Sequence, residues 1–203
     1  DRRQRQMCIR DSIATGEPGS TAASTLPLQD ILVTDGVFTA FGPGLAQQYE
    51  AQGGDLAAIE VVDLGGKLVC PPFCDTHLHL DYVFTARKPG AVNESGTLFE
   101  GIQRWSETKS DLTVDEIKQR AKIGIKKEML HGVQLIRSHA DVTDPNLTSL
   151  KALLELKEEL KDTVTLQIVS FPQEGMYSYE GPHGESGAEL VEEGLKMGAD
   201  CVG

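Results

Sequence analysis

Two histidines, His77 and His79, have the spacing in this chain that most directly suggests chemistry. In an extended strand, side chains at positions i and i+2 project from the same face. Both imidazoles are therefore expected on one side, with Leu78 turned toward the packing behind them. Two neutral imidazoles side by side make half of a metal site, so the pair predicts a bound metal ion, although a His-x-His pair also arises by chance.

The residues around the pair indicate how it is positioned. The apolar residues Leu68 and Val69 precede it and are typical of a buried strand, and Asp81 follows it on the same face. In a barrel of parallel strands, functional side chains lie at the carboxyl ends of the strands. The sequence therefore predicts a barrel strand that ends in metal ligands.

This stretch resembles the first barrel strand of the amidohydrolase superfamily. The resemblance rests on the Gly-Gly-Lys at 65–67, the Pro-Pro-Phe at 71–73 and the Asp-Thr-His-Leu-His-Leu-Asp at 75–81. Within the superfamily, residues 95–102, 137–142 and 166–175 resemble bacterial-type cytosine deaminases. The resemblance runs from about residue 30 to residue 203. It implies an α/β fold: the N-terminal part of a metal-dependent hydrolase TIM (β/α)8 barrel, preceded by a small β-sandwich segment.

The resemblance also assigns roles to residues. His77 and His79 match two metal ligands, which implies one divalent metal ion, iron or zinc, as the cofactor. Gln173 matches a glutamine that hydrogen-bonds the pyrimidine, and a neutral amide offers both a donor and an acceptor to a base edge. Leu98 matches a position that lines the substrate pocket. The implied partner is a pyrimidine-like small molecule.

Two further residues are expected behind the ligands. Asp81 and His139 are assigned to support the metal ligands by hydrogen bonding. Arg137 and Asp141 share the strand face of His139. For His139, the alternative of a core histidine with satisfied hydrogen bonds stays open.

The activity that the resemblance implies is metal-dependent hydrolytic deamination of cytosine to uracil plus ammonia, in pyrimidine salvage. The family's remaining ligands and its His-x-x-Glu pair belong to later strands, so we expect no catalytic acid or base within residues 1–203. The runner-up is a related amidohydrolase that acts on another cyclic amine, such as isoguanine, creatinine or an alkylaminotriazine. An insertion near residues 180–184 and the presence of Cys74 depart from the cytosine deaminase pattern, so the identity of the substrate stays open.

A structural zinc-site protein is the alternative from another class. Cys70 and Cys74 could join His77 and His79 in a Cys2His2 site, because the cysteine spacing suits zinc. Strand alternation opposes this reading, since positions 74 and 77 differ by an odd number and would face opposite sides.

Hydrophobic periodicity after the histidine pair predicts alternating helices and strands. Helices are expected at residues 98–109, 113–131, 144–161 and 188–197, and strands at 133–139, 164–171 and from 201 onward. Thr113 and Glu116 form a capping box, and Trp105 is expected in the core. Alternating strands and helices favour a parallel sheet. Only about four strands begin, so we expect an N-terminal fragment of a longer enzyme, inactive alone.

Ahead of the pair, short strands are expected on either side of Asp35-Gly36, which predicts a hairpin, and at residues 59–64. Residues 42–57, 82–97 and 174–185 are expected to be loops. Residues 13–66 are assigned to the β-sandwich segment and residues 67–203 to the first half of the barrel. Residues 1–12 resemble a translated sequencing adapter and are excluded from the fold, the alternative being a basic targeting arm.

Composition narrows the function classes. The net charge is −12, from 19 Lys and Arg against 31 Asp and Glu, which argues against a nucleic-acid or anionic-membrane partner. No apolar run approaches the ~18 residues that span a bilayer, and no signal peptide is recognised. Four cysteines without disulfide-framework spacing favour the cytoplasm. We expect the full-length protein to be a homo-oligomer.

Overall fold

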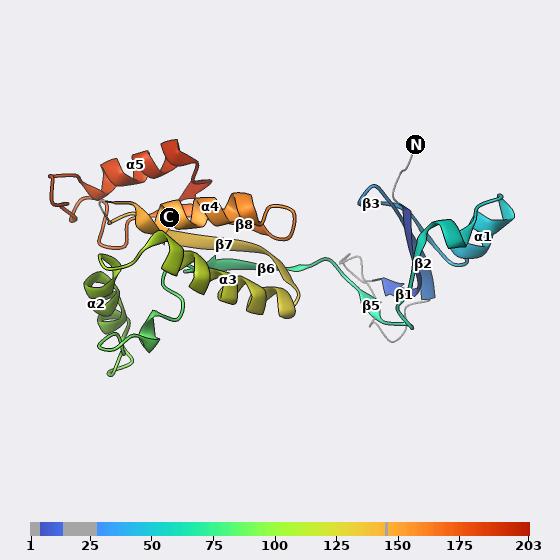
Figure 1. The fold of residues 1–203 in the computed structure, drawn as a ribbon, viewed down its shortest axis with the longest axis horizontal. Coiled ribbons are helices and arrows are strands. Elements are labelled where there is room, and N and C mark those ends of the chain that lie inside the picture. The colour runs from blue at the N-terminus through green and yellow to red at the C-terminus, as the bar shows by residue number, and fades with distance from the viewer. Residues whose placement is uncertain (1–4, 14–27, 145) are drawn as a thin grey trace, which may run out of the picture. The chain divides into compact units, whose positions relative to one another are not determined.

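The computed structural model describes residues 5–13, 28–144 and 146–203 (Figure 1). The chain divides into two compact units, Asp1–Pro71 and Pro72–Gly203. Each unit has its own sheet, and each is described separately below. Among the described helices, none combines the length and the apolar character needed to cross a lipid bilayer.

The first unit is built on one five-stranded mixed sheet. Its strands are β1 (Arg5–Ile13), β2 (Leu28–Thr34), β3 (Val37–Gly42), β4 (Glu60–Asp63) and β5 (Leu68–Val69). The order is β3-β2-β1-β4, and β5 also pairs with β1. Asp35 and Gly36 have φ angles of 53° and 77°, which a type I′ turn requires at both central positions. The predicted hairpin between β2 and β3 is therefore confirmed.

Three expectations for this unit differ from the structure. Residues 1–12 were excluded from the fold, yet Arg5–Ile13 form β1 between β2 and β4. Strand pairing uses backbone N–H and C=O groups, so a segment without apolar alternation can still pair. Residues 42–57 contain helix α1 (Leu45–Ala51) and the short helix η2 (Leu56–Ala58) instead of a loop. The described residues of this unit form one sheet, whereas a sandwich has two facing sheets.

The boundary between the units also differs from the predicted one. Leu68 and Val69 pair with β1 of the first sheet and are not part of the strand that leads to the histidine pair. Leu68 is exposed, not buried as expected. The boundary falls between Pro71 and Pro72. Proline has no backbone N–H to donate, so two consecutive prolines interrupt strand pairing at this point.

The second unit contains a parallel four-stranded sheet. Its strands are β6 (Phe73–Leu78), β7 (Val133–Asp141), β8 (Thr165–Phe171) and β9 (Cys201–Val202), in the order β6-β7-β8-β9. The helices are α2 (Leu98–Lys109), α3 (Val114–Leu130), α4 (Thr148–Glu159) and α5 (Gly187–Met197), with η3 (Thr85–Arg87) after β6. The predicted alternation of strands and helices around a parallel sheet is confirmed.

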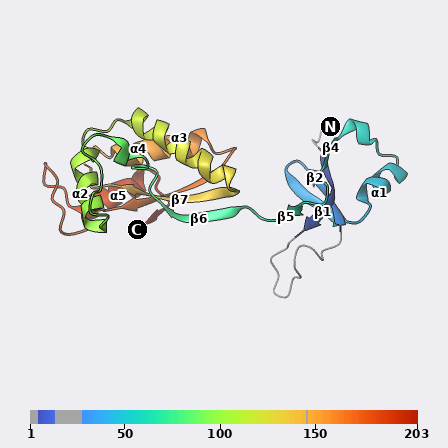
Figure 2. The same ribbon diagram turned by 90° about the horizontal axis from the view of Figure 1, so that it is seen from below.

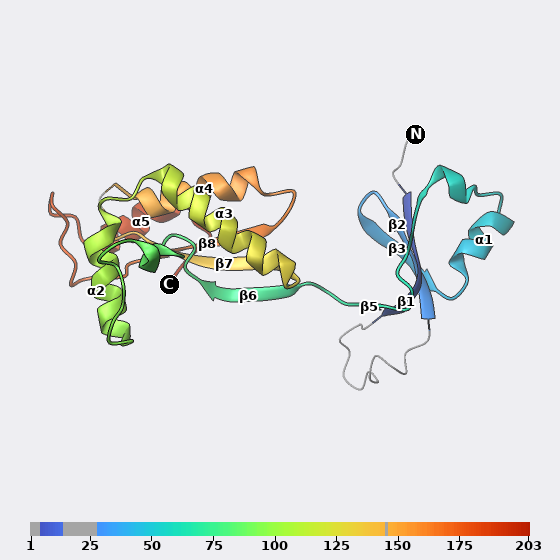
Figure 3. The ribbon, with the colours of Figure 1, turned by 60° about the horizontal axis from the view of Figure 1, so that its bottom comes forward.

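Helices α3 and α4 pack beside each other against one face of this sheet (Figure 2). The side chains between them are completely buried: Ile117 of α3, Leu150 and Leu153 of α4, and Ile136 and Ile168 of the strands. Each such burial contributes roughly 1.5–3 kcal/mol. Helix α2 lies instead at the carboxyl end of the strands (Figure 3).

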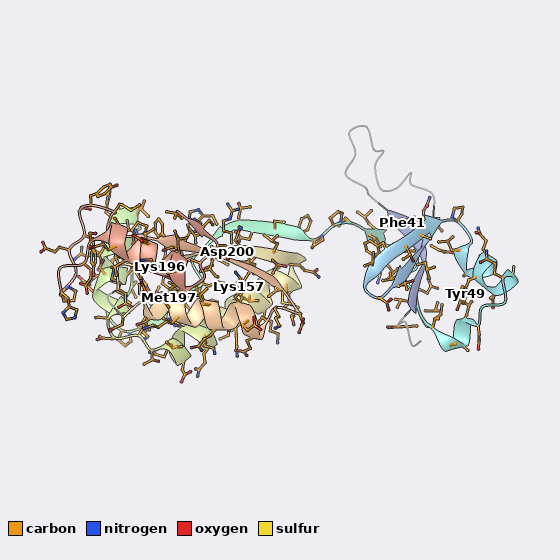
Figure 4. All side chains as sticks on the ribbon, turned by 90° about the horizontal axis from the view of Figure 1, so that it is seen from above. Phe41, Tyr49, Lys157, Lys196, Met197 and Asp200 are labelled. Atoms are coloured by element: carbon orange, nitrogen blue, oxygen red, sulfur yellow. The ribbon has the colours of Figure 1, made fainter. Side chains whose placement is uncertain are left out.

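The helix ends follow local sequence signals. Thr113 and Glu116 form the predicted capping box of α3, and Ser186 and Glu189 form another on α5. Helix α4 begins at Thr148, later than the predicted residue 144, because the backbone amide of Thr148 binds the carboxylate of Asp144 at 2.8 Å. On the same unit, Lys157 of α4 pairs with Asp200 at 2.6 Å (Figure 4).

The loop between β8 and α5 is closed at its base. The amide of Ala188 donates to the carbonyl of Met176 at 2.9 Å. A Cβ atom placed on Gly187 would lie 2.1 Å from the carbonyl oxygen of Gly175, so the backbones are in close contact. The tip turns through residues 181–184, where the amide of Gly184 donates to the carbonyl of Gly181 at 3.0 Å.

Candidate active site

Three imidazoles meet at the carboxyl ends of β6 and β7. The Nε2 atoms of His77 and His79 lie 3.3 Å apart, so both rings turn to one side as strand alternation predicts. The ring of His139 stacks on that of His77, with centroids 4.0 Å apart. Its centroid is 5.4 Å from that of His79. Leu78 turns toward the core, also as expected.

The environment keeps His79 uncharged at neutral pH. Burial lowers the pKa of His79 to about 4, and repulsion from His139 and His77 adds to the effect. Burial, followed by repulsion from His77, also lowers the pKa of His139. A neutral imidazole keeps a nitrogen lone pair free, which is the form that binds metals.

The spacing of the pair fits two ligands of one metal ion. Zinc–nitrogen bonds of about 2.0–2.1 Å at tetrahedral angles place two ligand nitrogens roughly 3.3–3.4 Å apart. The separation of 3.3 Å between His77 Nε2 and His79 Nε2 agrees with this. Within the described ranges, no group of three or more His, Cys, Asp or Glu side chains is arranged to hold a metal ion. The pair therefore offers two ligand nitrogens at a spacing that suits one ion, which is fewer than a complete ligand set.

The same result weakens the structural-zinc alternative. Cys70 and Cys74 are both exposed free cysteines. They form no four-ligand cluster with the histidine pair in the part of the chain that the structure describes. Cys74 lies in β6, three residues before His77.

Asp81 is completely buried behind the histidines. Its carboxylate accepts the backbone amides of Asp141 at 2.9 Å and of Tyr82 at 3.1 Å. Burial raises the pKa of Asp81 to about 7. Among the described residues, neither His77 nor His79 donates to this carboxylate, so Asp81 fastens the segment after β6 to the end of β7.

A buried charged cluster links this region to α2. The ammonium of Lys109 donates to Asp141 Oδ2 and to Thr143 Oγ1, each at 3.1 Å, and also to Glu174 Oε1. The indole of Trp105 donates to Asp141 Oδ2 at 2.7 Å. Trp105 is buried, as predicted, but its hydrogen bond and the role of Lys109 were missed. Their spacing of four residues places both on one helix face, which is the signal that could have found them.

The two predicted substrate residues lie in different settings. Gln173, half-buried after β8, directs its backbone amide to Asp141 Oδ1 at 3.4 Å. Phe171, two residues earlier, has its ring 5.7 Å from that of His79, so the Gln173 segment adjoins the imidazoles. Leu98 begins α2 with 74% of its surface exposed. The structure thus brings the histidines, Asp81 and the Gln173 segment together and leaves Leu98 on an open surface.

Comparison with known proteins identifies the family. The model of the amidohydrolase family matches residues 60–197, and the chain belongs to this family. It is 35% identical over 146 residues to N-isopropylammelide isopropyl amidohydrolase of Pseudomonas sp. strain ADP, covering 70% of this chain and 35% of the relative. It is 27% identical over 152 residues to pterin deaminase of Rhizobium rhizogenes, and the match covers 72% of this chain and 32% of that relative.

A solved structure extends the similarity to nearly the whole chain. The 5-methylcytosine deaminase of Klebsiella pneumoniae, liganded with 5-fluorocytosine, superposes with a TM-score of 0.77 at 38% identity. The match covers 97% of this chain and 42% of that one. The chain spans about a third of the length of the curated relatives it matches.

Proposed function

We propose that this chain forms part of a metal-dependent cytosine deaminase. In this reaction water adds to the ring carbon that carries the exocyclic amino group, the C–N bond breaks, and ammonia leaves to give uracil. The observation that carries the proposal is the His77–His79 pair, with its Nε2 atoms 3.3 Å apart beside the Gln173 segment. Similarity to a deaminase liganded with a cytosine analogue supports the substrate class.

His77 and His79 are proposed to hold one divalent ion, iron or zinc, as part of its ligand set. When bound, such an ion supplies the Lewis-acid activation of water that hydrolysis needs at neutral pH. The chain keeps the His79 ring neutral for this task through burial and the nearby imidazoles, which lower its pKa to about 4. The proton-transfer residues that the family resemblance implies are assigned to strands outside residues 1–203.

Gln173 is proposed to recognise the pyrimidine edge. Its side-chain amide carries a donor and an acceptor, which complements the adjacent N–H and C=O groups of such a ring. Asp141 holds the backbone amide of Gln173 at 3.4 Å. Leu98 is proposed to line the substrate pocket, where its exposed side chain would meet other parts of the complete protein.

The location and assembly of the protein belong to the same proposal. Two exposed free cysteines, Cys70 and Cys74, suit a reducing cytoplasm. We propose that the complete enzyme works there in pyrimidine salvage, as a homo-oligomer.

The test uses a complete protein that contains these residues, loaded with iron or with zinc. Metal content is measured in the wild type, in a His77→Ala, His79→Ala double variant and in His131→Ala, which changes an exposed histidine at the end of α3. We expect the double variant alone to lose metal and ammonia release from cytosine. Equal metal content in all three proteins, or a loaded wild type that releases no ammonia from cytosine, contradicts the proposal.

A second candidate is hydrolysis of an alkylaminotriazine. The specific observation in its favour is the 35% identity to N-isopropylammelide isopropyl amidohydrolase. Both reactions break an exocyclic C–N bond of a nitrogen heterocycle, so the ligand set cannot separate them. Assaying the same preparation with cytosine, isoguanine, creatinine and N-isopropylammelide separates them, because the favoured substrate has the highest kcat/KM.

A further inference from the structure

Lys109 is a buried lysine with a complete set of partners. Only 9% of its surface is exposed, and its ammonium donates to Asp141, Thr143 and Glu174. An ammonium has three N–H donors, so none is left for another ligand. A buried charge costs free energy unless it is paired and hydrogen-bonded, and this arrangement meets both conditions.

The partners of Lys109 hold the segment after β8 at two consecutive residues. Asp141 Oδ1 receives the backbone amide of Gln173 at 3.4 Å, and Lys109 binds the side chain of Glu174. The hydroxyl of Ser106 also donates to Glu174 Oε1, at 2.8 Å. Helix α2 therefore holds Glu174 directly and is linked to the backbone of Gln173 through Asp141.

Asp141 is itself held in place from several directions. Trp105 Nε1 lies 2.7 Å from its Oδ2 atom, while the amide and hydroxyl of Thr143 donate to Oδ1 at 2.8 and 2.6 Å. With these donors in place the carboxylate has little freedom to rotate. The hydrogen bond from Lys109 to Glu174 then sets where the following loop lies relative to β7.

The side chain of Gln173 takes no part in this cluster. Its backbone is held, but its amide side chain makes no hydrogen bond with another residue in the described ranges. The fixed backbone sets the position from which the free side-chain amide can reach a ligand, so the backbone at this point is ordered before binding.

We propose that Lys109 is a positioning residue for substrate recognition, which acts by joining Asp141 to Glu174 and so fixing Gln173. The inference rests on the proposed role of Gln173 in binding the pyrimidine. Lys109 itself does not touch the substrate in this account, and its effect passes through the loop backbone.

The test replaces Lys109 by Met in the complete, metal-loaded protein. Lys118 supplies a matched control, because it also contacts two carboxylates, Glu155 and Glu159, but joins α3 to α4 away from the loop. We expect Lys109→Met to raise the KM for cytosine at least fivefold while kcat stays within twofold. Lys118→Met is expected to leave both constants within twofold of wild type.

A double variant of Lys109 and Gln173 distinguishes a positioning role of Lys109 from a general structural role. Residues that act as one unit have non-additive effects. In a Gln173→Ala background, Lys109→Met is therefore expected to change KM by less than twofold. An unchanged KM in the single variant, or the full effect repeated in the Gln173→Ala background, overturns the proposal.

Amide hydrogen exchange at residues 173–175 gives a readout independent of the substrate. Exchange is expected to be faster in Lys109→Met than in wild type or Lys118→Met, and equal rates overturn the positioning role. A wild type without cytosine activity overturns the proposed function and the recognition claim together. If Lys109→Met does not fold, Glu174→Ala removes the same contact, because alanine has no acceptor for the Lys109 ammonium. The same results are expected, and a normal KM in that variant overturns the proposal.

Discussion

The proposed recognition of the pyrimidine edge depends on the side-chain amide of Gln173. Leaving one partner of a buried hydrogen bond unpaired costs ~1–3 kcal/mol. We therefore expect Gln173→Ala in the complete enzyme to lower kcat/KM for cytosine roughly 5- to 150-fold, since ~1.4 kcal/mol corresponds to tenfold. Steady-state kinetics with cytosine measures this. Gln167→Ala is the control, because Gln167 of β8 already pairs with Arg137 at 2.6 Å. An unchanged kcat/KM in a folded Gln173→Ala protein excludes direct recognition.

Gly187 makes the tightest backbone contact described above. An added Cβ would lie 2.1 Å from the carbonyl oxygen of Gly175, closer than real Cβ atoms approach. Overpacking of this kind costs typically ~1–3 kcal/mol, so Gly187→Ala should lower the Tm.

Gly101→Ala is the control for this prediction. It also places alanine in a helix, but its nearest neighbour is the amide end of Asn93, at 3.4 Å. Alanine in a helix is favoured over glycine by roughly 0.5–1 kcal/mol, so the Tm of Gly101→Ala should equal or exceed that of the wild type. Thermal unfolding measures the Tm of both variants. A Gly187→Ala protein with the Tm of the wild type contradicts the prediction.

Glu100 gives a pH-dependent prediction in the first turn of α2. Hydrogen bonds from Ser95 and Glu94 lower the pKa of Glu100 to about 2. A lowered folded-state pKa means that the contribution to stability is present above the ordinary value of about 4.3 and is lost as the pH falls toward 2.

We expect the Tm difference between wild type and Glu100→Gln to be largest above pH 5 and to shrink as the pH falls from 4 to 2. Thermal unfolding across this range measures it. Glu107→Gln is the control, since Glu107 on the same helix pairs with Arg104 at 3.3 Å and receives no backbone amide among the described contacts. A difference that stays constant over the whole range contradicts the prediction.

At the scale of elements, the capping box of α3 orients the long helix that covers β7. Thr113 accepts the amide of Glu116 at 3.2 Å, and Glu116 accepts the amide of Thr113 at 3.3 Å. Replacing such a cap with alanine typically costs ~0.5–2 kcal/mol. We expect Thr113→Ala to lower the free energy of unfolding by this amount and Thr113→Ser, which keeps the hydroxyl, to lower it much less. Equal free energies of unfolding of the two variants in chemical denaturation would contradict a stabilising role of the Thr113 hydroxyl.

Elements with strong local signals could be predicted from the sequence. The capping box fixed the start of α3, and Asp35-Gly36 fixed the hairpin, because both depend on residues next to each other in the chain. Helix α1 was missed because its seven residues lie between glycines, where composition favours a loop. Leu68 and Val69 were assigned to the wrong sheet, since apolar pairs do not specify a partner strand.

The candidate site was predictable only in part, because a sequence pattern reveals only contacts between residues that are close together in the chain. The orientation of His77 and His79 toward the same side follows from strand alternation, which depends only on neighbouring residues. The contact of Lys109 with Asp141 and Glu174 joins residues 32 and 65 positions away and depends on how α2 packs. No short-range pattern encodes such a contact, so the charged cluster required the structure.

At the scale of the molecule, the second sheet has two edge strands, β6 and β9, in the described residues. Unpaired backbone N–H and C=O groups at such edges invite association. The face opposite the helices is not uniformly apolar, since Arg137 pairs there with Gln167. We predict that a polypeptide of residues 1–203 alone self-associates and does not release ammonia from cytosine.

Size-exclusion chromatography with light scattering, followed by an ammonia assay with added iron or zinc, tests this prediction. A monodisperse, metal-loaded and active polypeptide of these residues would contradict both parts of it. Activity alone would show that the chain contains its own proton-transfer residues, which the family resemblance assigns elsewhere.

The closed base of the loop between β8 and α5 has a consequence for enzyme engineering. The Met176–Ala188 hydrogen bond and the Gly175–Gly187 contact isolate the tip at residues 181–184 from its anchor points. We therefore expect a sequence inserted or exchanged at the tip to leave Gln173 on one side and the Ser186 cap on the other in place. The tip is therefore a suitable place to insert a tag or an epitope.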